Sequence, residues 1–331
     1  MFILPASSLQ TPASAERYTV IISGIGGEAS YSAQHWKWAS GLYQVLKEQY
    51  GIPSDHLFLF VEEVKDPKIP AQKASLEAVN RTFAALAQRL AQTDLLFVLL
   101  IGHGNADAGE AKLSIPGPDL TAAGLNDRLS AIKAGRIVVV NGASASGPFI
   151  EALSGPGRII ITATKSGGEK QATIFPEHFL AALSGSSSDL DKDGRVDLLE
   201  AFNATKLKTA AWYDERDRIA TEHPLLDDNG DHVGSREPGG ADPDGSLART
   251  ITFGEKKSLA DQPRLAPQVL AQLNTLQTKA QELQRQVDAL KLEKSRLPEA
   301  QYNARLEVLL IELARVNREI TRLKQSVTSD K

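Results

Sequence analysis

The sequence contains no cysteine, which excludes disulfide bonds, thiolate zinc sites and thiol nucleophiles. No stretch approaches the roughly 18 apolar residues that a membrane-spanning helix needs. Basic and acidic residues nearly balance, with 37 Lys and Arg against 41 Asp and Glu, so no global positive field exists to attract nucleic acid or an anionic membrane. The composition is otherwise that of a globular protein, because 42% of the 331 residues are hydrophobic and 24% are charged. The length predicts roughly two domains.

The first 16 residues carry only part of an export signal. Ala13-Ser14-Ala15 resembles the small-x-small site that signal peptidase cuts, but the basic region and the full apolar region that precede such a site are missing. This segment is predicted to be either a disordered tail or the remnant of a signal peptide. The second interpretation favours a periplasmic or secreted location over a cytoplasmic one.

Residues 17–185 alternate short β-rich apolar runs with longer helical stretches. This alternation predicts an α/β domain with a mainly parallel sheet flanked by helices. The near-continuous Val, Ile and Leu content of the runs indicates that both faces of the sheet are covered. Strands are predicted at residues 18–23, 56–61, 94–101, 136–141 and 158–164, and helices at about 32–50, 72–91 and 121–134.

A twelve-residue acidic segment, residues 189–200, has the spacing of an EF-hand calcium loop. Gly194 at the sixth position allows the positive φ of the tight turn, and alternating carboxylates face inward around it. The predicted Ca²⁺ ligands are Asp189, Asp191, Asp193, the backbone carbonyl of Arg195, Asp197 and Glu200. A single loop indicates a structural ion, because sensor loops generally act in pairs. The alternative is an acidic surface turn.

Residues 186–255 are predicted to hold this loop, a helix and a second acidic, Gly-rich loop. The run Asp227–Asp231 resembles another turn of oxygen ligands, but His232 stands where glycine is expected and no glutamate follows at the twelfth position. The run is therefore compatible with a second bound ion or with none.

Residues 256–331 are predicted to form an antiparallel, coiled-coil-like helical hairpin. Apolar residues recur at alternating spacings of three and four along residues 269–290 and again along residues 302–327. Pro298 lies between the two seams, where it would end one helix and suit the first turn of the next. One hairpin leaves part of each apolar stripe exposed, which predicts packing on the α/β domain or self-association.

Two Gly-rich turns follow predicted strands, one with His103 and Gly104 and the other with Ser144. Functional groups collect beyond the carboxyl ends of parallel strands, so the two turns are expected to face one another. This arrangement suits a histidine base, a hydroxyl nucleophile and an oxyanion hole of backbone N–H groups. The alternative is a strand-end histidine bonded to a carbonyl beside an ordinary turn. A Gly-rich run at residues 24–29 only loosely fits a nucleotide-binding pattern, because the acid after the next strand is misplaced.

Over about residues 18–170 these segments resemble the caspase-like peptidase fold, especially its legumain-like branch. The likeness is carried by the segment Tyr31–His35, by a strand that ends in Gly102-His103-Gly104, and by a strand that ends in Ala143-Ser144-Ala145-Ser146-Gly147. The resemblance implies that His103 and Ser144 stand at the family's catalytic histidine and cysteine. It also implies that Gln34, His35 and Gly104 border the substrate. Gln34 replaces an arginine of the specificity pocket, so asparaginyl specificity is not implied.

Two functions are compatible with this pattern. Serine in place of cysteine favours a catalytically silent pseudopeptidase that binds a protein or peptide partner, since a hydroxyl needs a well-oriented base. The alternative is an active peptidase or other acyl hydrolase with Ser144 as nucleophile and His103 as base. No acidic residue that would orient His103 is identifiable in the sequence.

Overall fold

The computed structural model describes residues 15–107, 110–185, 188–191, 194–253 and 297–328, together with single positions between 272 and 290. The predicted N-terminal tail up to residue 14 lies outside the described residues. So do the predicted ligand Asp193 and most of the first arm of the predicted hairpin.

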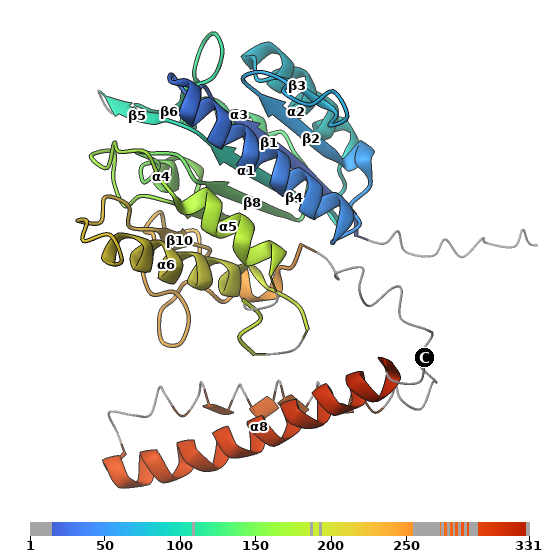
Figure 1. The fold of residues 1–331 in the computed structure, drawn as a ribbon, viewed down its shortest axis with the longest axis vertical. Helices are drawn as coiled ribbons and strands as arrows, with labels where there is room; N and C mark the ends of the chain where they lie inside the picture. Colours follow the sequence, from blue (N-terminus) through green and yellow to red (C-terminus); the bar gives the residue numbers. More distant parts are fainter. Residues whose placement is uncertain are drawn as a thin grey trace, which may run out of the picture.

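A seven-stranded sheet forms the centre of the fold, in the order β10-β9-β8-β4-β1-β2-β3 (Figure 1). Five of its six strand pairs are parallel, and β10 runs antiparallel to β9. This confirms the predicted α/β fold with a mainly parallel sheet. The strands are β1 (Arg17–Ser23), β2 (Leu57–Val61), β3 (Ala71–Lys73), β4 (Leu95–Ile101), β8 (Arg136–Asn141), β9 (Arg158–Thr162) and β10 (Leu225–Asp227).

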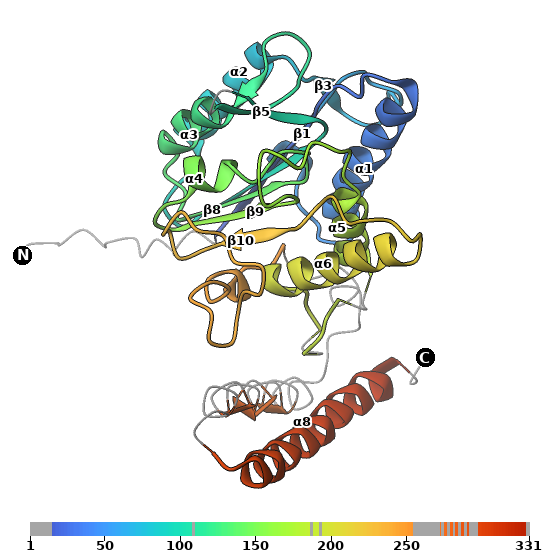
Figure 2. The same ribbon diagram turned by 90° about the vertical axis from the view of Figure 1, so that its left-hand side faces the viewer.

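Helices cover both faces of this sheet, which lies between α1 and α5 on one side and α2 and α3 on the other (Figure 2). Successive strand residues point to opposite faces, so Ile21 belongs to the hydrophobic cluster that includes residues of α1, α5 and α6, whereas Val20 and Ile22 belong to the cluster that includes residues of α2, α3 and α4. Two hydrophobic clusters therefore share one sheet. The helices are α1 (Ala29–Glu48), α2 (Leu76–Arg89), α3 (Ala122–Ser130), α4 (Phe149–Leu153), α5 (Phe175–Ser184) and α6 (Leu198–Asp214).

Short polar side chains decide where several helices begin. The Ser75 hydroxyl accepts the Ala78 N–H at the start of α2, and Thr121 caps α3 in the same way. The helix predicted at residues 72–91 therefore begins only at Leu76, because Ala71–Lys73 pair with β2 as strand β3. Asp197 and Glu200 form a capping box at the start of α6.

A small antiparallel sheet leaves the main sheet where β4 ends. It consists of β5 (Gly104–Asp107), β6 (Glu110–Leu113) and β7 (Leu120–Thr121). Because β5 starts only three residues after β4, Gly104 lies at the junction of the two sheets. Two short 3-10 helices, η1 (Ser54–His56) and η2 (Ala248–Thr250), complete the regular elements up to residue 253.

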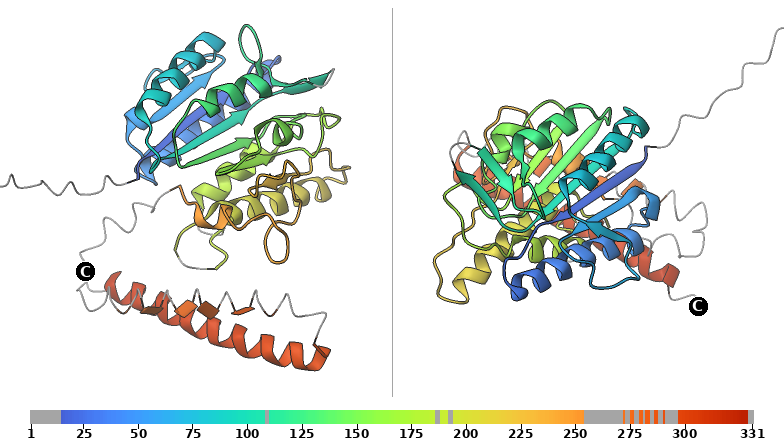
Figure 3. Two further views of the ribbon diagram at one scale, coloured as in Figure 1. Left: turned by 180° about the vertical axis from the view of Figure 1, so that it is seen from behind. Right: turned by 90° about the horizontal axis from the view of Figure 1, so that it is seen from above.

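The C-terminal region contains α8 (Glu299–Thr328), shown in Figure 3. Ala280, Leu283, Val316 and Ile320, which lie on the predicted apolar seams, are buried against one another. The Lys279 ammonium lies 2.9 Å from the Glu312 carboxylate. The antiparallel hairpin itself stays a prediction, since most of its first arm lies outside the described residues. Among the described helices, none is both long and apolar enough to cross a bilayer.

Candidate functional site

The carboxyl ends of β4 and β8 bring the two predicted catalytic turns together. These strands are parallel neighbours with Leu100 opposite Asn141, so both chains leave the sheet at the same edge. The Gly104 N–H donates to the Ser144 hydroxyl over 3.1 Å, and the hydroxyl lies 3.3 Å from the Gly104 carbonyl. A Cβ at Gly104 would lie 2.3 Å from the Ser144 carbonyl oxygen, so only glycine permits this approach.

Ser144 lies inside the fold and is only 1% exposed. Its hydroxyl both accepts from and donates to the Gly104 backbone. The next residue, Ala145, has a φ of 51°, a left-handed conformation that non-glycine residues rarely adopt. The Ala145 N–H donates to the Glu169 carbonyl over 2.8 Å, which helps to hold this strained turn.

His103 lies among aromatic rings at the same edge of the sheet. Its Nε2 is 3.2 Å from the Gly26 carbonyl oxygen, and its ring centroid is 5.0 Å from Tyr31 and 5.2 Å from His35. Within the described part of the chain, no hydrogen bond joins His103 to Ser144 or to a carboxylate. The catalytic pair therefore stays a prediction.

Two of the three residues predicted to border the substrate, Gln34 and His35, lie on the first turns of α1, and the third, Gly104, begins β5. His35 is buried, and burial together with the neighbouring His103 lowers the pKa of His35 to about 4, so the ring is neutral near pH 7. Gln34 is half-buried. Nearby, the Glu62 carboxylate accepts hydrogen bonds from the Ser32 hydroxyl (2.7 Å) and the Gly26 N–H (3.2 Å), which fixes the Gly-rich loop after β1.

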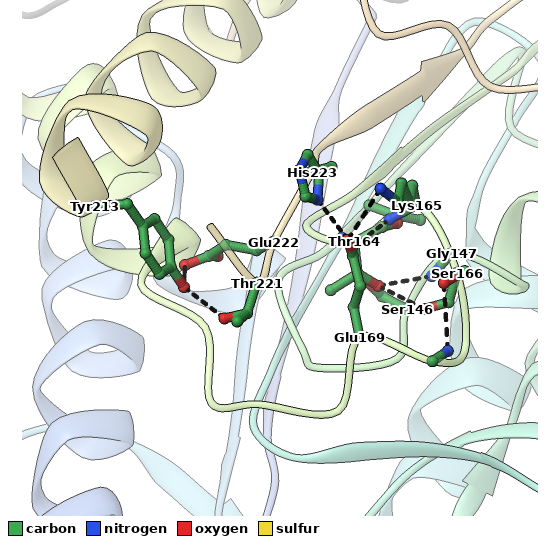
Figure 4. Close-up of polar contacts among 12 residues, drawn as sticks. Ser146, Gly147, Thr164, Lys165, Ser166, Glu169, Tyr213, Thr221, Glu222 and His223 are labelled. Atoms are coloured by element: carbon green, nitrogen blue, oxygen red, sulfur yellow. Dashed lines mark hydrogen bonds and ion pairs between the residues drawn. The ribbon is translucent and has the colours of Figure 1, made fainter. Parts of the chain in front are cut away.

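A second polar group lies beside the Ser144 turn, on residues that the sequence analysis did not identify (Figure 4). The Glu169 carboxylate accepts the Lys165 N–H over 2.9 Å and contacts Nδ1 of His223. The Lys165 ammonium lies 3.7 Å from the same carboxylate. Glu169 follows β9, whereas His223 precedes β10 and is 54 residues away in sequence. Neither residue belongs to a recognisable motif, so the sequence carries no signal for this pair.

The turn after Ser144 is also tied to the end of β9. The Ser146 and Thr164 hydroxyls lie 3.0 Å apart, and the Thr164 hydroxyl accepts the Gly147 N–H over 3.0 Å (Figure 4). The Thr164 N–H in turn donates to the Ser146 hydroxyl. Because Ser146 and Thr164 are fully buried, this network rigidly positions the segment that carries Ser144.

Glu222 is a buried carboxylate next to His223 in the chain. It accepts hydrogen bonds from the Ile174 and Phe175 N–H groups. The Tyr213 hydroxyl also donates to it (Figure 4). Burial raises the pKa of Glu222 to about 7, although these donors oppose the shift. Its role here is to hold the start of α5.

The predicted calcium loop brings three carboxylates together. Oxygen atoms of Asp189, Asp191 and Glu200 lie within 4.8 Å of one another. Gly194 has a φ of 90°, as the sixth position of such a loop requires, and its N–H donates to the Asp189 carboxylate over 2.9 Å. This all-oxygen set fits Ca²⁺, which prefers carboxylate and carbonyl ligands.

Glu200, at the twelfth position, lies at the centre of this loop. One of its carboxylate oxygens accepts the Leu190 N–H (2.7 Å) and the Asp191 N–H (3.1 Å). Burial, reinforced by Asp197 and Asp191, raises the pKa of Glu200 to about 8. Asp197 accepts the Glu200 N–H over 2.8 Å as the cap of α6. The predicted ligand Arg195 is exposed.

Comparisons with known proteins add little beyond the architecture. No protein-family model matches the sequence, and no curated protein is similar to it in sequence. Among solved structures, the chain is similar to the crystal structure of drICE, with 12% sequence identity and a TM-score of 0.39. That match covers 64% of this chain and 87% of the drICE chain. A similarity of this degree assigns neither a family nor an activity.

Proposed function

We propose that this protein is a calcium-binding, catalytically silent member of the caspase-like peptidase fold, of the legumain-like branch, that serves as a protein-interaction scaffold. One observation carries the proposal of silence. The Ser144 hydroxyl is buried and is engaged in both directions by the Gly104 backbone, so it acts as a clamp between two turns.

The surroundings of His103 also support a silent site. A serine nucleophile needs a base within hydrogen-bond reach, and that base needs a third group to orient it. The hydrogen-bond partner of His103 is the Gly26 carbonyl. A carboxylate at this edge of the sheet contacts His223 instead of His103. That carboxylate belongs to Glu169, in the loop that follows β9.

Calcium has a structural role in this proposal. Asp189, Asp191 and Glu200 would hold the ion together with the remaining predicted ligands, and the ion would supply positive charge to these partly buried carboxylates. Because Glu200 also belongs to the capping box of α6, the bound ion would stabilise the start of that helix.

The partner-binding surface is proposed to lie on α8. Val308, Leu310 and Ile311 are 63%, 46% and 47% exposed, which is high for large apolar side chains. Arg315 and Glu319 border a cavity lined by Val308 and Ile311. An apolar stripe flanked by charged residues is typical of helices that pair with another helix, so self-association through this region is proposed.

Active-site labelling tests the proposal. The purified, calcium-loaded protein is treated with a broad fluorophosphonate probe and its intact mass is measured. We expect no adduct on the wild-type protein or on the Ser144→Ala variant. An adduct on the wild type that is lost in Ser144→Ala and kept in Ser166→Ala would overturn the proposal and establish the alternative, a hydrolase with Ser144 as nucleophile and His103 as base.

A further inference from the structure

Three buried aspartates lie at the end of β10 and in the segment that leads from it to η2. Asp227, Asp228 and Asp244 are only 1%, 7% and 2% exposed. Among the described residues, no lysine, arginine or histidine forms an ion pair with any of them. Buried carboxylates without a positive partner are strongly unfavourable, because the charge loses its hydration and gains nothing in return.

Backbone N–H groups donate hydrogen bonds to only some of these carboxylate oxygens. Asp228 accepts from the Gly245 and Ala248 N–H groups through its two oxygens. Asp227 accepts the Gly230 N–H through Oδ1, over 3.1 Å. Its Oδ2 is buried and has no hydrogen-bond partner among the residues that the structure describes. One fully buried carboxylate oxygen is therefore available for a ligand.

The loop that starts at Asp227 shares a hydrogen-bond pattern with the loop that starts at Asp189. In the first loop, one Glu200 oxygen accepts the N–H groups of the second and third residues, Leu190 and Asp191. In the second loop, Asp244 Oδ1 accepts the N–H groups of the second and third residues, Asp228 (3.0 Å) and Asn229 (3.3 Å). Asp244 thus occupies the place of the twelfth-position glutamate, although it lies 17 residues after Asp227.

The sixth position of the second loop also has the positive φ that such loops require at that position. His232 stands there and has a φ of 68°, the left-handed conformation for which glycine is usually needed. The His232 N–H donates to the Ser154 hydroxyl over 3.1 Å, and its ring Nδ1 lies 2.9 Å from the Glu151 carbonyl. These contacts with the α4 region hold the strained residue. Both departures that weakened the motif in the sequence, the histidine and the missing glutamate, are accounted for by tertiary contacts.

We propose that Asp227 and Asp244 form a second divalent-cation site of the calcium class, separate from the loop at residues 189–200. Carboxylate oxygens select a hard cation, and Ca²⁺ tolerates ligands drawn from irregular loops better than Mg²⁺ does. Asn229 and Asp231 hydrogen-bond to each other at the rim of this loop. The inference uses the first loop as its geometric template, but it does not require that loop to bind calcium.

Native mass spectrometry of the full chain with Ca²⁺ tests this site. We expect two bound ions for the wild type, one for Asp227→Asn, one for Glu200→Gln and none for the double variant. Asn and Gln keep an acceptor oxygen for the backbone N–H groups, so the fold is expected to survive, as thermal melting will show. Asp214→Asn, at the exposed end of α6, is the matched control and is expected to retain both ions.

The outcomes separate the two loops. A wild type with one ion that is lost in Glu200→Gln and kept in Asp227→Asn would overturn the second site and leave the first. A wild type with one ion that is lost only in Asp227→Asn would support the second site and overturn the first. No bound ion would overturn both. If Asp227→Asn does not fold, the number of ions bound to Glu200→Gln tests the second site. One retained ion would support that site, and the absence of any bound ion would overturn it.

Discussion

Ser144 shows how a residue in a candidate catalytic position can serve the fold instead. Its buried hydroxyl joins the ends of β4 and β8 through the Gly104 backbone, and the strained Ala145 follows directly. A hydroxyl held in this way has its donor and an acceptor lone pair occupied. Glu222 is a second such residue, a carboxylate buried to hold a helix start.

Replacing Ser144 with alanine is expected to lower the free energy of unfolding by about 1 to 3 kcal/mol, because the Gly104 N–H and carbonyl lose their partner. Urea unfolding followed by circular dichroism measures this change. The control Ser166→Ala removes an exposed hydroxyl and is expected to change stability by less than about 0.5 kcal/mol. If Ser144→Ala lowers the free energy of unfolding no more than Ser166→Ala does, the Ser144 contact contributes little to stability.

Glu222 is expected to make stability depend on pH. Its pKa in the folded protein is about 7, above its ordinary value of 4.5, so its favourable contribution is complete below pH 4.5 and is lost as the pH rises through 7. The loss is on the order of 3 kcal/mol. Urea unfolding at pH 5, 6, 7 and 8 should show wild-type stability falling relative to Glu222→Gln. Parallel pH profiles for the two proteins would contradict this account.

Among the elements, one short segment joins the acidic loop at residues 189–200 to the core. Leu198 at the start of α6 donates its N–H to the Ile251 carbonyl over 2.8 Å, and Asp197 forms an isolated bridge with Thr252. The next residue, Phe253, is fully buried and stacks on Phe97 of β4 with ring centroids 4.1 Å apart. The end of the loop is thereby fixed relative to the main sheet.

Phe253→Ala is expected to lower the unfolding free energy by about 3 to 5 kcal/mol through the cavity it leaves. It is also expected to weaken Ca²⁺ binding by the loop at residues 189–200, because the strand bridge to Asp197 loses its anchor. Phe149→Ala is the matched control, since Phe149 is equally buried in the cluster on the other face of the sheet. Calcium titration calorimetry below the melting temperature distinguishes them: the control should lose stability and keep its affinity for calcium.

At the scale of the whole molecule, two hydrophobic clusters share the seven-stranded sheet, and a third cluster lies in the C-terminal region. The third cluster shares no residue with the other two. It joins Val316 and Ile320 of α8 to Ala280 and Leu283. The apolar side chains that α8 exposes belong to the surface proposed for self-association.

The substitution Val308→Asp with Ile311→Asp is expected to reduce the solution mass to that of one chain without lowering the melting temperature, because both side chains are exposed. Sedimentation equilibrium over a range of protein concentrations measures the mass. Leu207→Asp, which replaces an exposed leucine on α6, is the control and should leave the mass unchanged. A wild-type protein that is monomeric at every concentration would show that this surface does not mediate self-association.

Features that depend on neighbours in the chain were predictable from the amino-acid order. Apolar runs marked β1, β2, β4, β8 and β9, and the spacing of acids and glycine marked the first acidic loop, because strand alternation and loop chemistry are local patterns. Long-range folding instead brings Ser144 to Gly104, Glu169 to His223 and Asp244 to the N–H group of Asp228. Each of these contacts joins residues 16 to 54 positions apart. Such pairs arise from the order of strands in the sheet and from the path of the loops at its edges, which no local spacing encodes.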